Sequence, residues 1–474
     1  MSVQRLVAWA YAGQLTSVAV SFAGAVLLAR LLTPFEMGVY ALAAAISGVV
    51  SLIASSGLGN YIIREVDPDN ATLETAFTLN AILNAIISGG LLMIAHFRLW
   101  LGLDAGVASV LEILALVPLF ATFEFRPAAM LQRTLQFKRI AYVQTASVAA
   151  NVGFTVVLAI AGFSYYSIAY GLVAGAAISA ILMSLAGPQF VSLRPNLSRS
   201  RRIIIFGAQI LSISGLATLI ARLCEAILGW TLGLAALGLY TRATTIASLL
   251  FNNIYGTATR VAFAKFSEDA RTTSSIEESF MSAMENILAI MWPLFAGVGI
   301  LAAPLVRLLF GDRWIEASGP LSFLMLAYWI ALLFGMNWEV FVIRKETAKQ
   351  VRIEVVRAVC AVVLFAIGST FSLRGAALGR VGDCVVGAIL YLPSMTRLIG
   401  TSGRRLFGVY RRAFVLTLLA AGPSLLLMIS WSWSPAVPIP SLVLAVLAGI
   451  ILWILGLLGQ KHPLLAHGRL LIFG

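Results

Sequence analysis

The segment LLARLLTPFEMGVYALAAAISGVVSLIASSGLG, residues 27–59, has a counterpart two hundred residues further along the chain. The counterpart, LGWTLGLAALGLYTRATTIASLLFNNIYG, covers residues 228–256. At this offset, GVY at 38–40 aligns with GLY at 238–240. The match raises the question of whether the chain contains the same arrangement twice.

The composition is typical of an integral membrane protein. Of the 474 residues, 60% are hydrophobic and 11% charged, and the mean hydropathy is +0.95. A soluble domain carries roughly a quarter charged residues. The apolar residues come in blocks of about 20, which fits helices crossing a bilayer, and the alternating pattern of a membrane barrel is absent. We therefore predict an all-α polytopic membrane protein whose first helix is an uncleaved span.

Hydropathy predicts about fourteen transmembrane helices, at 6–29, 38–63, 76–97, 108–129, 140–162, 165–187, 203–228, 236–262, 281–302, 318–343, 353–371, 375–396, 413–431 and 437–458. With the N-terminus inside, twenty-three of the 33 Lys and Arg residues fall in inner segments and five in outer loops. This bias predicts cytoplasmic N- and C-termini. It also explains the net charge of +13 without a nucleic-acid partner.

Further matches extend the repeat beyond the first quoted segment. AGQLTS at 12–17 aligns with GAQILS at 207–212, and AYG at 169–171 aligns with ALG at 377–379. We predict a duplication of six helices, with an N-terminal lobe over 1–190, a C-terminal lobe over 191–400 and two additional helices with a tail over 401–474. Because six is even, the copies cross the membrane in the same sense, as parallel repeats around a central cleft.

The loops argue against an enzyme. Every outer loop is short, so no catalytic domain fits outside, and the chain contains no GxxxxGK[ST] phosphate-binding motif. The three cysteines lie in apolar segments, which gives no disulfide framework. We expect no catalytic residue, no cofactor and no metal.

Charged residues inside the predicted spans are the candidate site. Arg222 with Glu225, and Arg380 with Asp383, are spaced i, i+3 and face the same side of a helix, whereas Arg242 has no such partner. Ionisable groups within a membrane usually face protein, water or a ligand, and arginine binds phosphate oxygens in a bidentate manner. The three arginines are therefore candidates for binding a pyrophosphate, and structural ion pairing is the alternative for the two pairs.

Uncharged polar residues in the spans are candidates for contacting sugar hydroxyls. They are Gln14, Asn60, Gln209 and Asn252. Hydrogen bonding between helices is their alternative role. Arg126, Arg260 and Arg357 lie near the inner ends of spans, and we expect them to extend to lipid phosphates.

Two motifs resemble a known family. LLTPFEMG at 31–38 and ALGLYTRA at 236–243 are similar to text in bacterial polysaccharide transporters, the Wzx-type flippases of the multidrug/oligosaccharidyl-lipid/polysaccharide exporter superfamily. Met37 departs from the Phe that is common there. The resemblance extends over essentially the whole chain, including the fourteen-span plan.

This resemblance implies a function. The protein would move a polyprenyl-pyrophosphate-linked oligosaccharide across the bacterial inner membrane for exopolysaccharide, capsule or O-antigen synthesis. It would use an ion gradient, with Glu225 or Asp383 as the coupling group. The implied partners are membrane lipids, a polysaccharide polymerase and a chain-length regulator.

Two other functions compete with this one. A multidrug or cation antiporter of the same superfamily predicts twelve spans and a cavity dominated by carboxylates. A membrane-embedded polysaccharide polymerase needs long external loops, which this chain lacks. A scaffold without transport activity is a further alternative.

Overall fold

A computed structural model describes residues 3–52, 57–65, 68–191, 194–272 and 275–465, and the side chains at 3–12 and 208–217 lie outside that description. Two compact units divide the chain, residues 1–238 and 239–474. The helices of unit 1 are α1 (Val3–Leu31), α2 (Pro34–Ser51), α3 (Leu58–Arg64), α4 (Asn70–His96), α5 (Ala105–Leu114), α6 (Val117–Arg133), α7 (Phe137–Ile160), α8 (Tyr166–Ala186), η2 (Pro188–Phe190) and α9 (Ser200–Thr231). Helix α10 (Leu234–Leu250) runs from unit 1 into unit 2.

Unit 2 continues with a π-helical turn and further helices. They are η3 (Phe251–Tyr255), α11 (Gly256–Thr272), α12 (Glu277–Ile300), α13 (Ala302–Phe310), η4 (Asp312–Ala317), α14 (Ser318–Ala331), η5 (Leu332–Phe334), α15 (Asn337–Ile343), α16 (Thr347–Phe371), α17 (Leu373–Ile399), α18 (Gly403–Ser430) and α19 (Ile439–Gly459).

The predicted helical membrane class is confirmed. Among the described residues, 12 segments are long and apolar enough to cross a membrane, and each coincides with a predicted span. Helices α9 and α16 cover the two remaining predicted spans. The total of fourteen stays a prediction.

The motif LLTPFEMG folds into the junction between α1 and α2. Thr33 is the N-cap of α2: its Oγ1 accepts from the Glu36 N–H at 3.3 Å, and its own N–H donates to Glu36 Oε2 at 2.7 Å. Pro34 occupies the first helical turn, where its missing N–H costs nothing. The capping box therefore ends one span and starts the next within a few residues.

Gly38 and Gly238 explain the repeat that opens the sequence. A Cβ placed on Gly38 would overlap the carbonyl oxygen of Leu234, and one placed on Gly238 would overlap that of Pro34. Pro34 and Leu234 are themselves two hundred residues apart. The first turns of α2 and α10 therefore contact each other reciprocally inside unit 1, and only glycine permits this approach. A reciprocal contact at one constant offset supports a duplicated chain.

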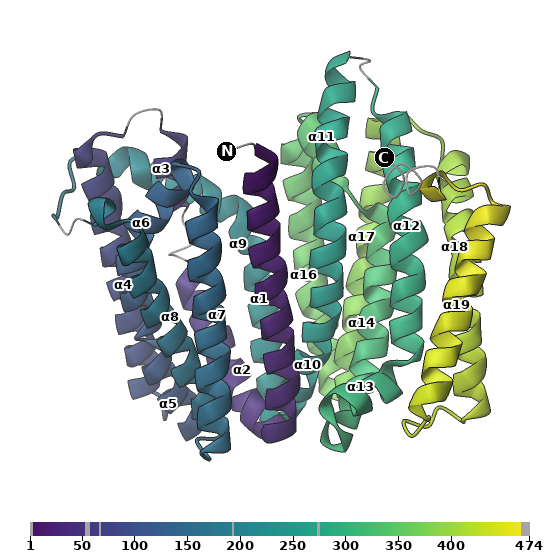
Figure 1. Ribbon diagram of the computed structural model, residues 1–474, viewed down its shortest axis with the longest axis horizontal. Coiled ribbons are helices and arrows are strands. Elements are labelled where there is room, and N and C mark those ends of the chain that lie inside the picture. Colours follow the sequence, from purple (N-terminus) through teal and green to yellow (C-terminus); the bar gives the residue numbers. More distant parts are fainter. Residues whose placement is uncertain (1–2, 53–56, 66–67, 192–193, 273–274, 466–474) are drawn as a thin grey trace. The chain divides into compact units, whose positions relative to one another are not determined.

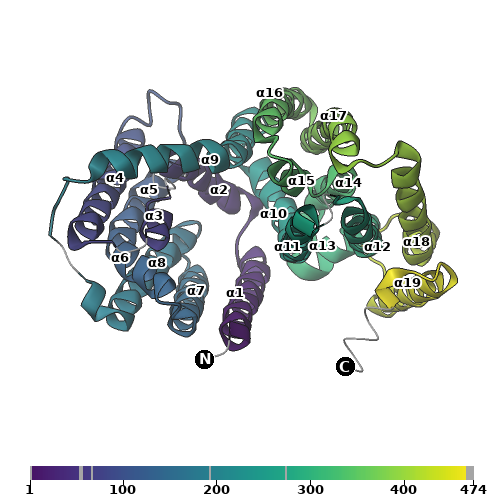
Figure 2. The ribbon, with the colours of Figure 1, turned by 90° about the horizontal axis from the view of Figure 1, so that it is seen from above.

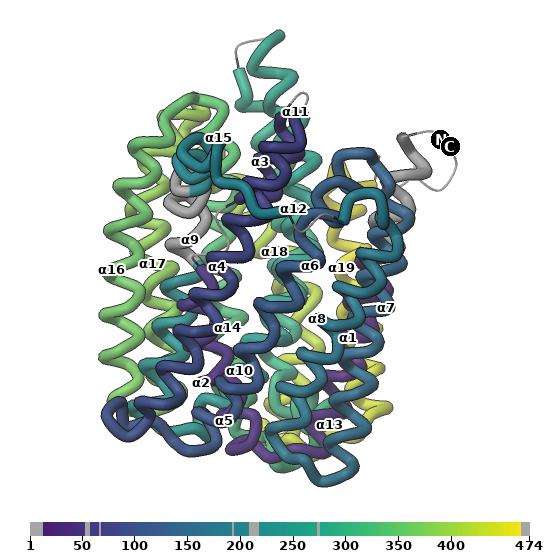
Figure 3. The backbone as a smooth tube through the Cα atoms, turned by 90° about the vertical axis from the view of Figure 1, so that its left-hand side faces the viewer, coloured from purple at the N-terminus to yellow at the C-terminus, as the bar shows by residue number. Residues whose placement is uncertain are grey.

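The two long hairpins repeat a second contact. In unit 1, α7 and α8 lie side by side (Figure 1), and a Cβ on Gly171 would lie 2.8 Å from the Asn151 carbonyl oxygen. In unit 2, α16 and α17 pack along their lengths (Figure 3), and a Cβ on Gly379 would lie 2.6 Å from the Leu364 carbonyl oxygen. Gly171 and Gly379 are the residues that the sequence alignment pairs.

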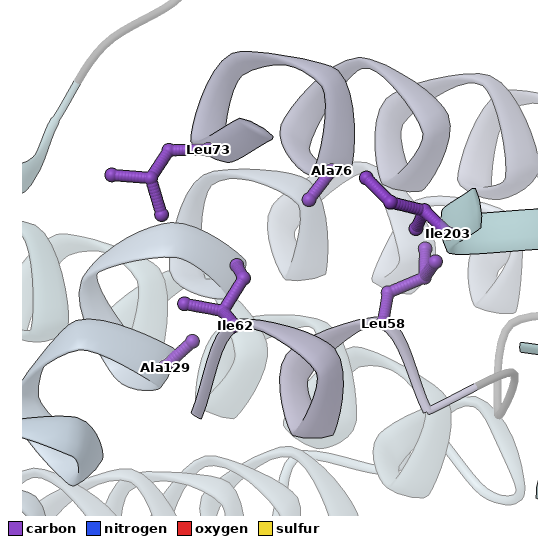
Figure 4. Packing of buried hydrophobic residues seen from close by; sticks show 6 residues of the cluster. All are labelled: Leu58, Ile62, Leu73, Ala76, Ala129 and Ile203. Carbon is purple, nitrogen blue, oxygen red and sulfur yellow. The ribbon is translucent and has the colours of Figure 1, made fainter. Parts of the chain in front are cut away.

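The interior of unit 1 contains a small apolar cluster where α3, α4, α6 and α9 meet. Its members are Leu58, Ile62, Leu73, Ala76, Ala129 and Ile203 (Figure 4). Helix α9 packs on α2, α3 and α4, so its contacts place it in unit 1. The predicted lobe boundaries at 190 and 400 concern the repeat, and they stay a prediction.

Unit 2 is built around α12, α14 and α17. Trp292 of α12 stacks on Trp329 of α14 at 4.0 Å between ring centroids, and its Nε1–H donates to the Trp329 carbonyl at 2.9 Å. Helix α18 packs on α12, and α19 packs on α18 (Figure 2). The two C-terminal helices are thus an outer layer of this unit.

Candidate functional site

Arg222 and Glu225 form the ion pair that their spacing predicts. Arg222 Nη1 lies 2.8 Å from Glu225 Oε2, and the side chains are 36% and 20% exposed. A Cβ on Gly48 of α2 would lie 2.7 Å from Arg222 Nε, so the absence of a side chain there leaves room for the guanidinium. The pair lies at the contact between α9 and α2 in unit 1.

Arg380 and Asp383 also pair, at 3.0 Å between Nη1 and Oδ2, but they belong to a larger network. Arg357 Nε of α16 donates to the other oxygen of Asp383 at 3.0 Å. Asp383 is fully buried, whereas Arg380 is 30% exposed. Asp383 therefore neutralises two guanidinium groups from two helices.

The network continues on α16. Arg357 Nη1 lies 3.2 Å from Glu354 Oε2, which also accepts from the Tyr391 hydroxyl at 2.8 Å. Two arginines thus face two carboxylates, and the described network is close to neutral. The expectation that Arg357 extends to lipid phosphates is wrong, because its Nε and Nη1 bind carboxylates inside unit 2.

Arg242 of α10 is 5% exposed and packs against aromatic rings. Its guanidinium carbon lies 5.9 Å from the ring centroid of Phe310 and 5.6 Å from that of Trp314. These rings come from α13 and η4, and they stabilise the cation through their π-faces.

The predicted sugar-contacting residues are dispersed. Gln14 of α1, Asn60 of α3 and Asn252 of η3 are exposed. Within the described residues no hydrogen bond joins any two of these three side chains. The side chain of Gln209 lies outside the described ones.

A buried polar row in unit 1 was not predicted. Asn84 Nδ2 donates to Asn80 Oδ1 at 3.0 Å and to Thr122 Oγ1 at 3.1 Å, between α4 and α6. One turn further along α6, Arg126 is 8% exposed, so its expected reach to lipid phosphates is wrong. Within the described residues, its Nε and Nη1 have no hydrogen-bond partner. The sequence contains Arg126 and the two asparagines, but it does not indicate that Arg126 is buried.

Two helix irregularities of unit 2 are hydrogen-bonded together. The π-helical turn η3 ends at Tyr255, whose hydroxyl accepts from the Met336 N–H at 2.6 Å. Met336, with φ of +57°, interrupts the helical path between η5 and α15. Phe251 stacks between Tyr255 and Tyr328 at 4.7 and 4.6 Å. Extra-residue turns of this kind are frequent at functional sites.

No group of three or more His, Cys, Asp or Glu side chains that could hold a metal ion occurs in the described part of the chain. The carboxylates of Glu225, Glu354 and Asp383 instead form ion pairs with arginine.

Solved structures with this fold define the class. The chain resembles the structure titled "Lipid II flippase MurJ, inward closed conformation", with a TM-score of 0.77 and 12% identity over 96% of this chain and 99% of that chain. It also resembles an inward-facing multidrug resistance MATE transporter of the MOP superfamily, with a TM-score of 0.54 and 20% identity over 85% of this chain and 97% of that chain. The chain therefore shares the fold of these two proteins.

The family is narrower. The model described as "Polysaccharide biosynthesis protein" matches residues 27–319, and the chain belongs to that family. Its relatives include "Succinoglycan biosynthesis transport protein ExoT" of Rhizobium meliloti, 24% identical over 69% of this chain and 66% of ExoT. "Lipopolysaccharide biosynthesis protein WzxC" of Escherichia coli is 22% identical over 60% of this chain and 59% of WzxC.

The membership confirms the family predicted from the two motifs. An "Uncharacterized membrane protein in cps region" of Klebsiella pneumoniae is 21% identical over 81% of this chain and 80% of that protein. None of these names describes an enzyme. The chain is a multi-pass membrane protein of this polysaccharide biosynthesis family.

Proposed function

We propose that this protein translocates polyprenyl-pyrophosphate-linked oligosaccharide repeat units across the bacterial inner membrane. The units serve exopolysaccharide, capsule or O-antigen synthesis, and both termini of the chain are cytoplasmic. The family match over residues 27–319 carries this proposal, because the relatives it groups together are named for polysaccharide pathways.

Charged side chains within the spans support the diphosphate part of the substrate. Arg222 and Arg380 are partly exposed and each already binds a carboxylate, which is the geometry that a phosphate oxygen would take over. Arg242, stacked on aromatic rings, is the third candidate. Asn60 and Asn252, together with Gln14 and Gln209, are proposed to contact sugar hydroxyls.

An apolar cavity in unit 2 supports the lipid part of the substrate. It has a volume of about 390 Å³ and lies among α12, α14 and α18, with Phe295, Trp329 and Leu425 in its walls. A polyprenyl chain needs such a surface because it gains free energy only from apolar burial.

We propose alternating access driven by an ion gradient. Protonation of Glu225 breaks one ion pair, whereas protonation of Asp383 breaks two. Glu225 is therefore the coupling candidate that changes state at lower cost, and its partner Arg222 becomes available for substrate at the same moment. A multidrug antiporter remains the second candidate, supported by the lower-scoring MATE likeness.

The test uses the full-length protein in liposomes. Undecaprenyl-diphosphate oligosaccharide is placed in the inner leaflet, and its appearance outside is followed by digestion with an added glycosidase. We expect translocation that rises with an imposed ion gradient and falls at least tenfold in Arg222→Ala or Arg380→Ala. Efflux of a cationic dye with no movement of the lipid-linked sugar would contradict the proposal.

A further inference from the structure

A separate open pocket lies in unit 1, where α7 begins and α8 ends. Its volume is about 550 Å³, and its walls include Arg139, Tyr142 and Val143 of α7, Leu185 of α8 and Gln189 of η2. We call it the interfacial pocket. Both helices are candidate membrane spans that have these residues at one end, so the pocket lies at a membrane–water boundary.

Arg139 is fixed in the wall of the interfacial pocket. Its Nη1 donates to the carbonyl oxygen of Ala186, the last residue of α8, at 2.7 Å. That one bond orients the guanidinium fork and leaves its other N–H groups for a ligand. No carboxylate of the described residues forms an ion pair with Arg139, and no acidic residue lines the pocket. The positive charge is therefore uncompensated from within unit 1.

The rest of the pocket is suited to the other parts of a lipid. The Gln189 amide supplies a further hydrogen-bond donor, and Lys138 lies 6.0 Å from the ring centroid of Tyr142. Leu185 is 70% exposed, and Ile181, one turn earlier on the same face of α8, is 57% exposed. A free anion would have no use for this apolar strip, whereas an acyl or prenyl chain would pack along it.

We propose that the interfacial pocket binds the phosphate group of a membrane lipid. Arg139 engages the phosphate oxygens, Gln189 donates to them, and the hydrocarbon chain lies along Leu185 and Ile181. Two lipids carry this chemistry, an anionic phospholipid and a polyprenyl diphosphate. Basic pockets between spans at the cytoplasmic face bind anionic head groups in other membrane proteins, and the lysine and arginine bias predicts that this face is cytoplasmic.

The experiment is lipid binding by the purified full-length protein, measured by native mass spectrometry. Phosphatidylglycerol is titrated against the wild type, Arg139→Gln and Gln189→Glu, with diacylglycerol as the lipid that lacks phosphate. We expect about a tenfold loss of affinity in Arg139→Gln, which is the scale of one charged hydrogen-bonding group. Gln189→Glu keeps the shape of the side chain and adds a negative charge. It should therefore also lower the affinity for phosphatidylglycerol.

Arg271→Gln is the matched control, because Arg271 is also an exposed arginine that donates to a backbone carbonyl, at 3.1 Å, but lies on α11. Equal phosphatidylglycerol affinity in wild type, Arg139→Gln and Gln189→Glu, or an equal loss in Arg271→Gln, would overturn the proposal. All variants must melt within a few degrees of the wild type.

Competition identifies the source of the phosphate. Displacement of phosphatidylglycerol by undecaprenyl diphosphate, but not by inorganic pyrophosphate, assigns the pocket to the polyprenyl carrier; no displacement by either assigns it to phospholipid. Displacement by pyrophosphate alone would contradict a lipid site. None of these measurements involves transport. The lipid-binding proposal can therefore fail while the proposed transport function stands, and the transport function can fail while the lipid site stands.

Discussion

Asp383 is the residue on which the charged network of unit 2 depends. Spacing along one helix predicts its pair with Arg380, and that pair is present at 3.0 Å. The bond from Arg357 was not predictable, because it joins two helices whose rotation about their axes is fixed by glycine contacts that no spacing rule describes. Local pairs can be predicted from sequence, and pairs between helices need the packing.

The bond between Arg357 and Asp383 changes the expected result of exchanging the charges of Arg380 and Asp383. In Arg380→Asp/Asp383→Arg, the new arginine at 383 would face Arg357 instead of a carboxylate. We expect the double variant to lose polymer export and to fold poorly, even if Arg380 serves structure alone. Surface polymer and membrane protein level, measured together in a deletion strain, check this; full export would show that Arg357 is not held by residue 383.

A direct test of the charged network removes the guanidinium of Arg357. Arg357→Ala leaves a fully buried Asp383 with one guanidinium, and breaking a buried ion pair costs about 3–5 kcal/mol. We expect a lower melting temperature in detergent. The control is Arg352→Ala, an exposed arginine on the same helix, which should leave the melting temperature unchanged; equal effects would contradict the buried network.

Asp69, before the α4 span, predicts a pH dependence. Thr72 donates two hydrogen bonds to its carboxylate, and with the Arg199 guanidinium at 2.8 Å they hold the pKa of Asp69 below its usual value. A lowered pKa stabilises the fold above the unfolded-state value and loses that effect as pH falls through the folded-state value. Asp69→Asn should therefore be less stable than wild type at pH 7, and the difference in melting temperature should shrink below about pH 4.

At the scale of elements, the spans were predictable and their interruptions were not. Blocks of apolar residues locate each membrane helix, because burial in lipid requires them. The π-turn at Phe251–Tyr255 and the left-handed Met336 contain ordinary residues, and their conformations depend on a hydrogen bond between distant helices. Such tertiary effects override local propensity.

The contact between α2 and α10 gives an element-scale prediction. In Gly38→Ala or Gly238→Ala a methyl group would overlap a backbone carbonyl, which cannot move as a side chain does. We expect a lower melting temperature and lower export for each variant. Gly153→Ala in α7 is the control, since nothing lies within 4 Å of its Cβ position, and it should be neutral or slightly stabilising. Three equal melting temperatures would contradict the close contact.

At the scale of the whole molecule, the sequence predicts a repeat with a boundary at 190, whereas contacts divide the chain into compact units after residue 238. Matched residues such as Gly171 and Gly379 each lie against a carbonyl oxygen of the preceding helix, which supports the repeat, and the repeat stays a prediction. Helix α9 falls in the predicted second copy but packs in unit 1. A repeat is found from matching residues, whereas a compact unit is found from the surfaces that helices bury against each other. The boundary of a repeat and the boundary of a compact unit can therefore fall at different residues.

The topology of the whole chain is testable. Fourteen spans with the N-terminus inside place both ends in the cytoplasm. A green fluorescent protein fused after residue 474 should be fluorescent, and alkaline phosphatase at the same place should be inactive. Fusions in the 97–105 region should give the opposite pattern. An active C-terminal phosphatase would mean an odd number of spans.

The two segments that the predicted repeat aligns differ in structure at their ends. In the first, α2 ends at Ser51 and α3 starts after Gly57, whose φ of +65° suits glycine. Two hundred residues on, Thr257 stands in place of Gly57, and a β-branched residue resists that conformation; there the rod continues and absorbs one additional residue per turn. The first segment therefore contains a left-handed glycine and the second a π-helical turn, which is underwound relative to an α-helix, so the two aligned segments are not equivalent in backbone conformation.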